Sequence, residues 1–182
     1  MFRRFVMWFV GVAAALALGS LGGGGAAAVA QTWSEYRPAG GGFRVEMPGT
    51  PTVKTDDVKI NNGRIAKQTQ ASVRVPKKAD YSVLYMDYPP DVGRGVPPEK
   101  LLEGLRSDIA THGKLRRDTA LTVGGAPARD FVVAARNNLA IVMRVVWFDN
   151  RLFQVSVLGL GLDVADAPDT RRFLDSFALV KP

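Results

Sequence analysis

The feature that most constrains this chain is the alternation of apolar and polar residues along most of its length after residue 40. Phe43, Val45 and Met47 alternate with polar neighbours, and the segment Pro48-Gly49-Thr50-Pro51 then interrupts the pattern. Alternation with a period of two is typical of strands that bury one face, and Gly and Pro at the breaks favour turns. The sequence therefore predicts a sheet built mainly from hairpins.

The same pattern recurs along the chain and predicts the other strands. We expect strands over residues 43–47, 52–60, 64–75, 81–88, 115–123, 128–135 and 139–148, and around 153–157. Asn61-Asn62-Gly63, Asn137-Asn138 and Asp149-Asn150 are predicted turns because Asn, Asp and Gly tolerate positive φ. Both faces of the strand over 139–148 are largely apolar and should be covered, whereas polar Gln154 predicts that the next strand faces solvent on one side.

Two segments change from the strand period to the helical period. The first predicted helix covers 100–112, is opened by two prolines and Glu99, and has Gly113 in the C′ position. The second begins near Pro168, and the acids on either side of this proline, Asp166 and Asp169, are expected to cap its start. The predicted fold class is therefore α+β, a central antiparallel sheet flanked by helices.

Residues 1–30 have the pattern of an export signal. Two arginines precede an apolar run over residues 5–21, and the stretch ends in the small-residue cleavage site Ala28-Val29-Ala30. Cleavage near Ala30 leaves one domain over 31–182, which is then periplasmic or secreted. The alternative is an uncleaved membrane anchor, because the run reaches the lower limit of roughly 17 residues for a membrane span.

Composition removes several classes of chemistry. The 182 residues hold no cysteine, which excludes disulfides, thiol nucleophiles and thiolate metal sites, and one histidine, which excludes a two-histidine metal site. Without residues 1–30, which carry two arginines and no acid, 22 basic and 17 acidic residues leave a net charge of +5. The basic pairs at 77–78, 116–117 and 171–172 are scattered, so we expect solvated surface or weak contact with an anionic membrane, and no nucleic-acid binding.

Four segments resemble the PsbP-like family. They are GGFRVEMPGTP at 41–51, YMDYP at 85–89, GAPARDF at 125–131 and RFLDSF at 172–177. The resemblance spans most of 33–180 and implies an α/β/α sandwich in which 85–89 lies in an edge strand and 125–131 in a mid-sheet hairpin. Family members include lumenal subunits that support photosystem assembly, a Ran-binding nuclear relative and exported bacterial proteins, and the leader here fits the exported bacterial branch. The resemblance implies a binding or assembly domain and carries over no functional residue.

His112 is the first candidate for chemistry. At the end of the first predicted helix its ring can cap free carbonyls and its charge suits the helix dipole. Asp108, one turn earlier, is the local carboxylate that could orient it as a general base. The simpler interpretation is a pair on the helix surface.

The remaining candidates have structural alternatives as well. Two groups of acids could supply a cation with oxygen ligands, although capping and turns also explain them: Asp163, Asp166 and Asp169, and Asp80, Asp87 and Asp91. Gly40-Gly41-Gly42 lacks the Lys-Ser/Thr ending and the helix of a phosphate loop, so it is predicted to turn the chain into its first long strand. Six aromatic residues suit either packing or a ligand groove: Trp33, Tyr36, Tyr81, Tyr85, Tyr88 and Trp147.

These observations predict no catalytic, cofactor-binding or metal-binding set. The expected function is that of an exported, non-enzymatic binding or assembly domain of the bacterial envelope, which holds a protein or small ligand in a cleft between sheet and helices. One alternative is a hydrolase with two carboxylates roughly 5 to 9.5 Å apart in a groove. Another is a peripheral membrane module held by an uncleaved leader.

Overall fold

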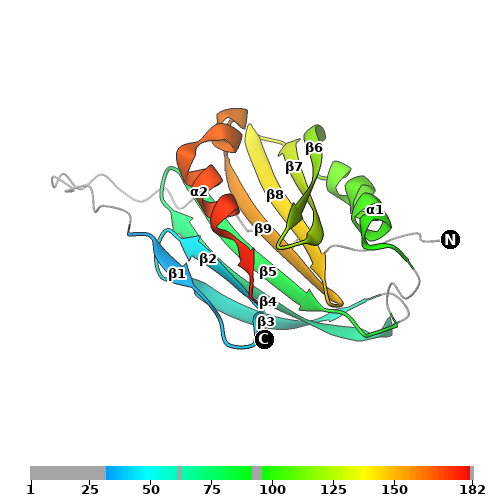
Figure 1. Cartoon of the computed structure of the whole chain (residues 1–182). Coiled ribbons are helices and arrows are strands. Elements are labelled where there is room, and N and C mark those ends of the chain that lie inside the picture. The colour runs from blue at the N-terminus through cyan, green and yellow to red at the C-terminus, as the bar shows by residue number, and fades with distance from the viewer. Residues whose placement is uncertain (1–31, 61–62, 92–95, 181–182) are drawn as a thin grey trace, which may run out of the picture.

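The computed structural model describes residues 32–60, 63–91 and 96–180 (Figure 1). Two sequence-based expectations lie wholly or partly outside these ranges: the export signal and the turn at Asn61-Asn62-Gly63. Among the helices that are described, none combines the length and the apolar character needed to cross a membrane.

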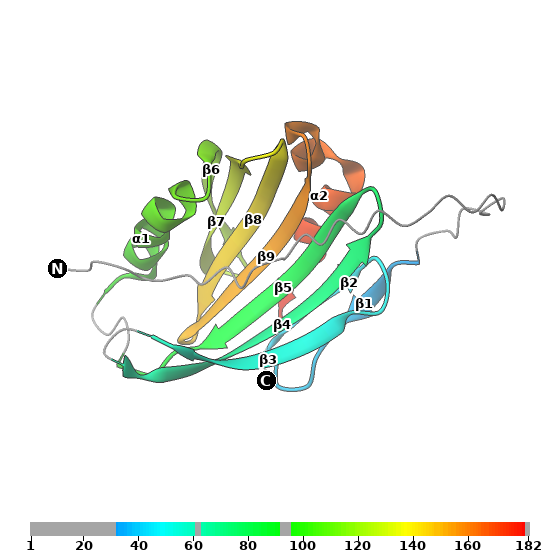
Figure 2. The same ribbon diagram turned by 180° about the vertical axis from the view of Figure 1, so that it is seen from behind.

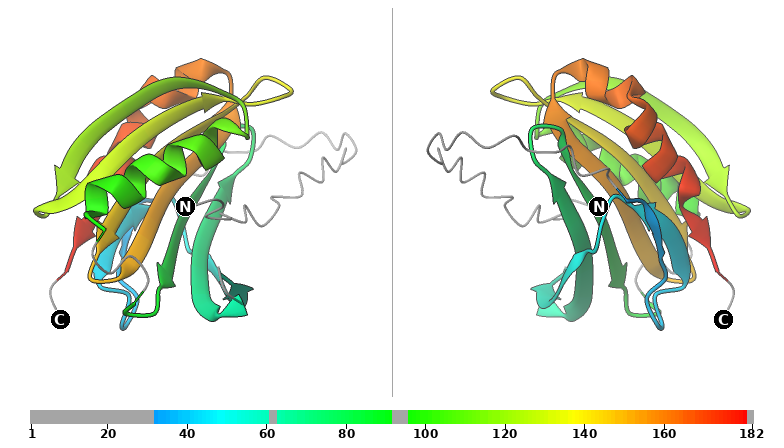
Figure 3. Two further views of the ribbon diagram at one scale, coloured as in Figure 1. Left: turned by 90° about the vertical axis from the view of Figure 1, so that its right-hand side faces the viewer. Right: turned by 90° about the vertical axis from the view of Figure 1, so that its left-hand side faces the viewer.

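A seven-stranded antiparallel sheet forms the centre of the fold. Its strands are β3 (Thr52–Lys59), β4 (Ile65–Val75), β5 (Ala79–Asp87), β6 (Lys114–Val123), β7 (Ala126–Ala134), β8 (Leu139–Phe148) and β9 (Arg151–Leu160). They are arranged in the order β3-β4-β5-β9-β8-β7-β6, and the sheet is twisted and curved (Figure 3). The predicted strands are therefore confirmed, with ends that differ by a few residues.

Two helices and a small sheet cover this central sheet unequally. Strands β1 (Ser34–Tyr36), β2 (Phe43–Met47) and β10 (Ala178–Leu179) form the small sheet in the order β1-β2-β10. This small sheet and helix α2 (Pro168–Ser176) lie on one face, and helix α1 (Pro98–Ala110) packs on β6, β7 and β8 on the other (Figures 1 and 2). A 3₁₀ helix, η2 (Leu162–Asp166), leads into α2. The fold is α+β as predicted, but its helical layers are minor.

Each face of the sheet has its own apolar core, because strand residues point alternately to opposite sides. Val142 and Val146 of β8 join the core under the small sheet and α2, whereas Met143 and Val145 join the core under α1. The first core centres on Phe43 of β2 and the second on the apolar stripe of α1, which is Leu101, Leu102, Leu105 and Ile109. The prediction that both faces of β8 are covered is confirmed.

Three expectations about the sheet are wrong. β5, which contains residues 85–87, lies between β4 and β9 and not at an edge, whereas the β6–β7 hairpin forms one edge of the sheet and not its middle. Gln154 is only 7% exposed, although its strand was expected to face solvent on that side. The neighbouring Leu152 belongs to the core under α1, so the face is apolar next to this glutamine.

The turns and the proline-led start of α1 follow the sequence, whereas the expected roles of Gly113 after α1 and of Asp166 before α2 do not. Asn137, Asn138, Asp149 and Asn150 have φ between 50° and 57°, as two-residue hairpin turns require. Gly113 is not a left-handed C′ residue. A glycine is needed at position 113 because a Cβ there would lie 2.2 Å from the Ala134 carbonyl oxygen.

The start of α2 also differs from the prediction. Its N-cap residue is Ala167, which makes no side-chain hydrogen bond to the helix. Asp166 instead pairs with Arg117 and Arg171, at 3.3 and 3.5 Å. Asp169 lies in the first helical turn, where a negative charge suits the helix dipole, and pairs with Lys78 at 3.5 Å.

Candidate functional site

A pocket of about 760 Å³ lies where the β1–β2 loop meets the turn between β8 and β9. Its lining consists of the loop, the turn and adjacent strand residues: Arg37, Pro38, Ala39, Gly40, Gly42, Phe43, Asp87, Phe148, Asp149, Arg151, Phe153 and Val180. None of these residues belongs to a helix. The expected cleft between sheet and helices is therefore not where this pocket lies.

Arg151, the first residue of β9, joins the parts of the pocket. Its guanidinium donates to both carboxylate oxygens of Asp87, with Nε to Oδ1 at 2.5 Å and Nη2 to Oδ2 at 3.0 Å. Nη1 donates to the carbonyl oxygens of Gly40 and Gly41 at 2.8 and 2.6 Å. One side chain thus fixes the loop before β2 to the end of β5.

The glycine loop owes this contact to its backbone conformation. Gly40 and Gly42 have φ of 70° and 73°, a region that side chains strongly disfavour. A Cβ on Gly41 would lie 2.5 Å from the side chain of Pro38, and the Gly41 amide donates to the Pro38 carbonyl at 3.0 Å. The expectation that these glycines turn the chain into a strand is confirmed, and the turn aims two carbonyls at Arg151.

Aromatic side chains form the apolar part of the pocket. Phe43 and Phe153 are 1% exposed and pack edge to face at 5.8 Å. The Arg151 guanidinium lies 5.3 Å from the Tyr85 ring and 6.0 Å from the Phe153 ring, within the range of cation–π attraction. Phe148, by contrast, is 41% exposed and offers an aromatic surface to a ligand.

Two charged side chains of the pocket have no ionic partner among the described residues. Arg37 of the β1–β2 loop and Asp149 of the β8–β9 turn are both exposed, and neither takes part in an ion pair within those ranges. A guanidinium is well shaped to bind a carboxylate or phosphate through two hydrogen bonds. The pocket can therefore offer both an exposed cation and an exposed aromatic ring.

The carboxylates of the pocket are Asp87 and Asp149. Both oxygens of Asp87 accept hydrogen bonds from Arg151, so this group is occupied as a structural ion pair. Burial raises the pKa of Asp108, which lies on α1 outside the pocket lining. Asp108 therefore contributes no carboxyl to this pocket.

The other sequence candidates lie elsewhere. His112 follows the end of α1, and its charge lowers the pKa of Asp108 against the larger effect of burial. Over the described ranges, no three His, Asp or Glu side chains come close enough together to hold a metal ion. Of the acids considered, Asp80 pairs with Arg74 at 2.8 Å, and Asp91 pairs with Arg64.

The six aromatic residues singled out from the sequence are distributed between the two cores, and none of them lines the pocket. Trp33 packs against Tyr81 at 5.8 Å and lies beneath the Arg172 guanidinium at 4.8 Å. Burial, with a smaller effect of Asp169, raises the pKa of Tyr81 to about 12. Tyr88 and Trp147 pack together at 5.3 Å under α1, and burial raises the pKa of Tyr88.

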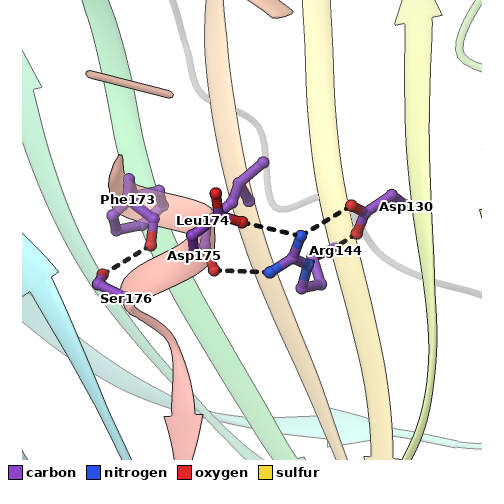
Figure 4. Close-up of polar contacts among 6 residues, drawn as sticks. All are labelled: Asp130, Arg144, Phe173, Leu174, Asp175 and Ser176. Carbon is purple, nitrogen blue, oxygen red and sulfur yellow. Dashed lines mark hydrogen bonds and ion pairs between the residues drawn. The ribbon is translucent and has the colours of Figure 1, made fainter. Parts of the chain in front are cut away.

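A second polar cluster anchors α2 to the sheet (Figure 4). Arg144 of β8, 9% exposed, donates to both carboxylate oxygens of Asp130 at 2.8 and 2.9 Å. It also donates to the Leu174 carbonyl at 2.8 Å and to Asp175 at 3.3 Å. This carbonyl lies in the last turn of α2 and also accepts from the Phe177 amide at 3.3 Å, so Arg144 adds a second donor at the helix end. This role is structural.

Sequence reasoning missed Arg37, Arg151 and Phe148. The available signal was the turn at Asp149-Asn150, which places Phe148 and Arg151 opposite each other at a hairpin end. The pairing of Arg151 with Asp87 needed the order of strands, because β5 and β9 are far apart in the sequence.

Comparison with known proteins supports the fold. No family model matches the chain, and no curated protein matches it in sequence. The solution structure of cyanobacterial PsbP (CyanoP) from Synechocystis sp. PCC 6803 matches with a TM-score of 0.50 and 14% identity, over 89% of this chain and 98% of that one. A protein of unknown function from Pseudomonas aeruginosa matches with a TM-score of 0.33 and 12% identity, over 76% and 85% of the two chains, which is too low to add to the argument. The chain therefore has a PsbP-like fold.

Proposed function

We propose that this protein is an exported, non-enzymatic binding domain of the bacterial cell envelope, from the exported branch of the PsbP-like family. The pocket between the glycine loop and the β8–β9 turn is its binding site. The observation that carries this proposal is that the exposed guanidinium of Arg37 and the exposed ring of Phe148 line the same pocket of about 760 Å³. That volume is within the range of roughly 300 to 1,000 Å³ that is usual for small-ligand sites.

The chemistry of the pocket favours a ligand with an anionic group and an apolar body. Arg37 can pair with a carboxylate or phosphate, and Phe148 can cover a flat or aliphatic group. Arg151 has its donors directed at Asp87 and the loop carbonyls, so it supports the pocket wall and leaves recognition to the rim. A partner protein can present the same chemistry through a side chain or its C-terminal carboxylate.

The binding proposal is tested with purified protein and a panel of aromatic and aliphatic carboxylates, using thermal shift followed by titration calorimetry. Arg37→Gln and Phe148→Ala should each weaken binding of a hit about tenfold or more. Arg116→Gln is the matched control, since Arg116 is an exposed arginine on β6 outside the pocket lining. Binding that is unaffected by the two pocket variants, or hydrolytic turnover that depends on Asp87 or Asp149, contradicts the proposal.

Export is tested separately by cell fractionation and by mass spectrometry of the native protein. The expected result is a periplasmic or secreted chain that begins at Gln31, since the pattern of residues 1–30 ends in a small-residue cleavage site. A membrane-bound chain that retains its first 30 residues would support the anchored alternative instead.

A further inference from the structure

The two edges of the seven-stranded sheet are protected very differently. Edge strand β6 has a bulge between Leu115 and Arg117, packs against α1, and uses Asp118 to pair with Arg106 and Arg129 at 2.8 Å. Bulges and covering helices are common means of keeping an edge strand from pairing with another chain. The β6 edge is therefore closed to a partner.

Edge strand β3 has none of these protections. Its eight residues pair with β4 in an unbroken register at the edge of the sheet (Figure 1). All of them except Val58 are exposed. Its outer backbone groups have no partner strand within the described sheet. Val53 is 49% exposed on this strand. A long, regular and exposed edge is a template for adding a strand from another chain.

The charges of β3 point to the identity of that chain. Lys54 and Asp56 lie on the same face of the strand, and neither forms an ion pair with a described residue. Their neighbours on β4 are Gln70, opposite Lys54, and Gln68, opposite Asp56, and both are neutral. The charges on the strand, Lys54, Asp56, Asp57 and Lys59, sum to zero. A second strand of the same composition therefore brings no net repulsion at the seam.

Symmetry restricts how two copies of β3 can pair. When a two-fold axis relates two antiparallel strands, each residue points to the same face of the sheet in both copies. Directly opposed residues also share a face, so their numbers must both be even or both be odd. In the register centred on Thr55, Lys54 lies opposite Asp56 of the second copy, and Asp56 lies opposite its Lys54. The registers centred on Lys54 or on Asp56 place like charges opposite each other, which destabilises the pairing.

We propose that this chain forms a two-fold symmetric homodimer by antiparallel pairing of β3 with β3, in the register centred on Thr55 and selected by two Lys54–Asp56 ion pairs. The seven-stranded sheets then become one continuous sheet whose remaining edges are the protected β6 strands. Because the two-fold contact is self-complementary, it closes at two copies and does not propagate into fibres. The proposal is independent of the pocket and its ligand.

The experiment is sedimentation equilibrium of the purified full chain over a range of protein concentrations. The wild type should be in reversible monomer–dimer equilibrium. Lys54→Glu and Asp56→Lys each replace two attractive pairs with two repulsive ones, so each should raise the dimer dissociation constant by roughly tenfold or more. Lys59→Glu is the control on the same strand, because Lys59 has no charged residue opposite it in this register.

An experiment that mixes the variants distinguishes a dimer in this register from a dimer formed in any other way. An equimolar mixture of Lys54→Glu and Asp56→Lys restores both opposite-charge pairs and should form a heterodimer, and the double variant should dimerise with itself as the wild type does. A wild type that is monomeric at every concentration overturns the proposal. So does a dimer that tolerates both single variants, or a mixture that stays monomeric.

Discussion

At the scale of single residues, the fold depends on a few arginines that link segments far apart in the chain. Arg144 joins two strands to the end of α2, and Arg151 joins β5 to the glycine loop. Their environments differ, because Arg144 is nearly buried whereas the side chain of Arg151 remains 22% exposed. Loss of a buried ionic partner costs far more than loss of an exposed one.

Arg144→Gln should therefore lower the free energy of unfolding by about 3 kcal/mol, at the lower end for a broken buried pair because Asp130 keeps some exposure. The measurement is urea unfolding followed by circular dichroism. Arg74→Gln is the matched control: it removes another two-point Arg–Asp pair, but an exposed one, and should cost about 0 to 1 kcal/mol. Equal losses for the two variants would contradict the structural role of Arg144.

Tyr81 should make the protein sensitive to alkali. Burial raises its pKa from 10.0 to about 12, so between these pH values the folded state holds a proton that the unfolded state releases. The free energy of unfolding then falls as pH rises through this window. Tyr81→Phe should lose less stability than the wild type between pH 8 and pH 11, measured as the change in urea midpoint. A wild-type midpoint that is constant over this range would contradict the burial of the phenol.

At the scale of elements, α1 provides a contrast between two glycines. Gly104 is an exposed helical residue with open space around its Cβ position, whereas a Cβ on Gly113 would overlap the backbone of β7. Gly104→Ala should stabilise the protein by about 0.5 to 1 kcal/mol, since alanine is the better helix former. Gly113→Ala should destabilise the protein, because the chain after α1 would have to move away from β7 to make room for the added Cβ. Thermal unfolding of both variants measures the two effects.

The elements were predictable where local chemistry decides them. Asn137-Asn138 and Asp149-Asn150 adopt the positive φ values that their residue types allow, and the strands beside them end where the turns begin. The short strands β1 and β10 were missed because three and two residues carry too little periodicity. The capping role of Asp166 was wrong because its carboxylate finds arginine partners in space, which local sequence does not reveal.

At the scale of the whole molecule, the sheet separates two cores. Ile109 of α1 belongs to one core and Val157 of β9 to the other. Substitutions without shared contacts add to within about 0.5 kcal/mol. The double variant Ile109→Val/Val157→Ala should therefore lose as much free energy of unfolding as the two single variants lose in sum. Chemical unfolding of all three variants measures this. A coupling above about 1 kcal/mol would mean that the sheet transmits packing strain between its faces.

The candidate site lay beyond sequence reasoning for the same reason that strand order did. The antiparallel class follows from hairpin turns, but hairpins do not show that β5 lies beside β9 or that β6 and β3 are the edges. Without that order, Asp87 and Arg151 are two unrelated residues, and the glycine loop has no partner. The residue types of Gly40-Gly41-Gly42 predict a turn. That this turn lines a pocket follows only from its tertiary contact with Arg151.

The position of β2 sets the time at which this fold can be completed. β2 is among the first strands to be synthesised, yet Arg44 pairs with Ala178 of β10, close to the end of the chain. Its aromatic residue Phe43 also stacks on Phe177, at a centroid distance of 5.5 Å. Strands β3 to β9 and both helices must therefore be synthesised before β2 finds this neighbour. Until then Phe43 of the nascent chain lacks its aromatic neighbour on this side of the fold.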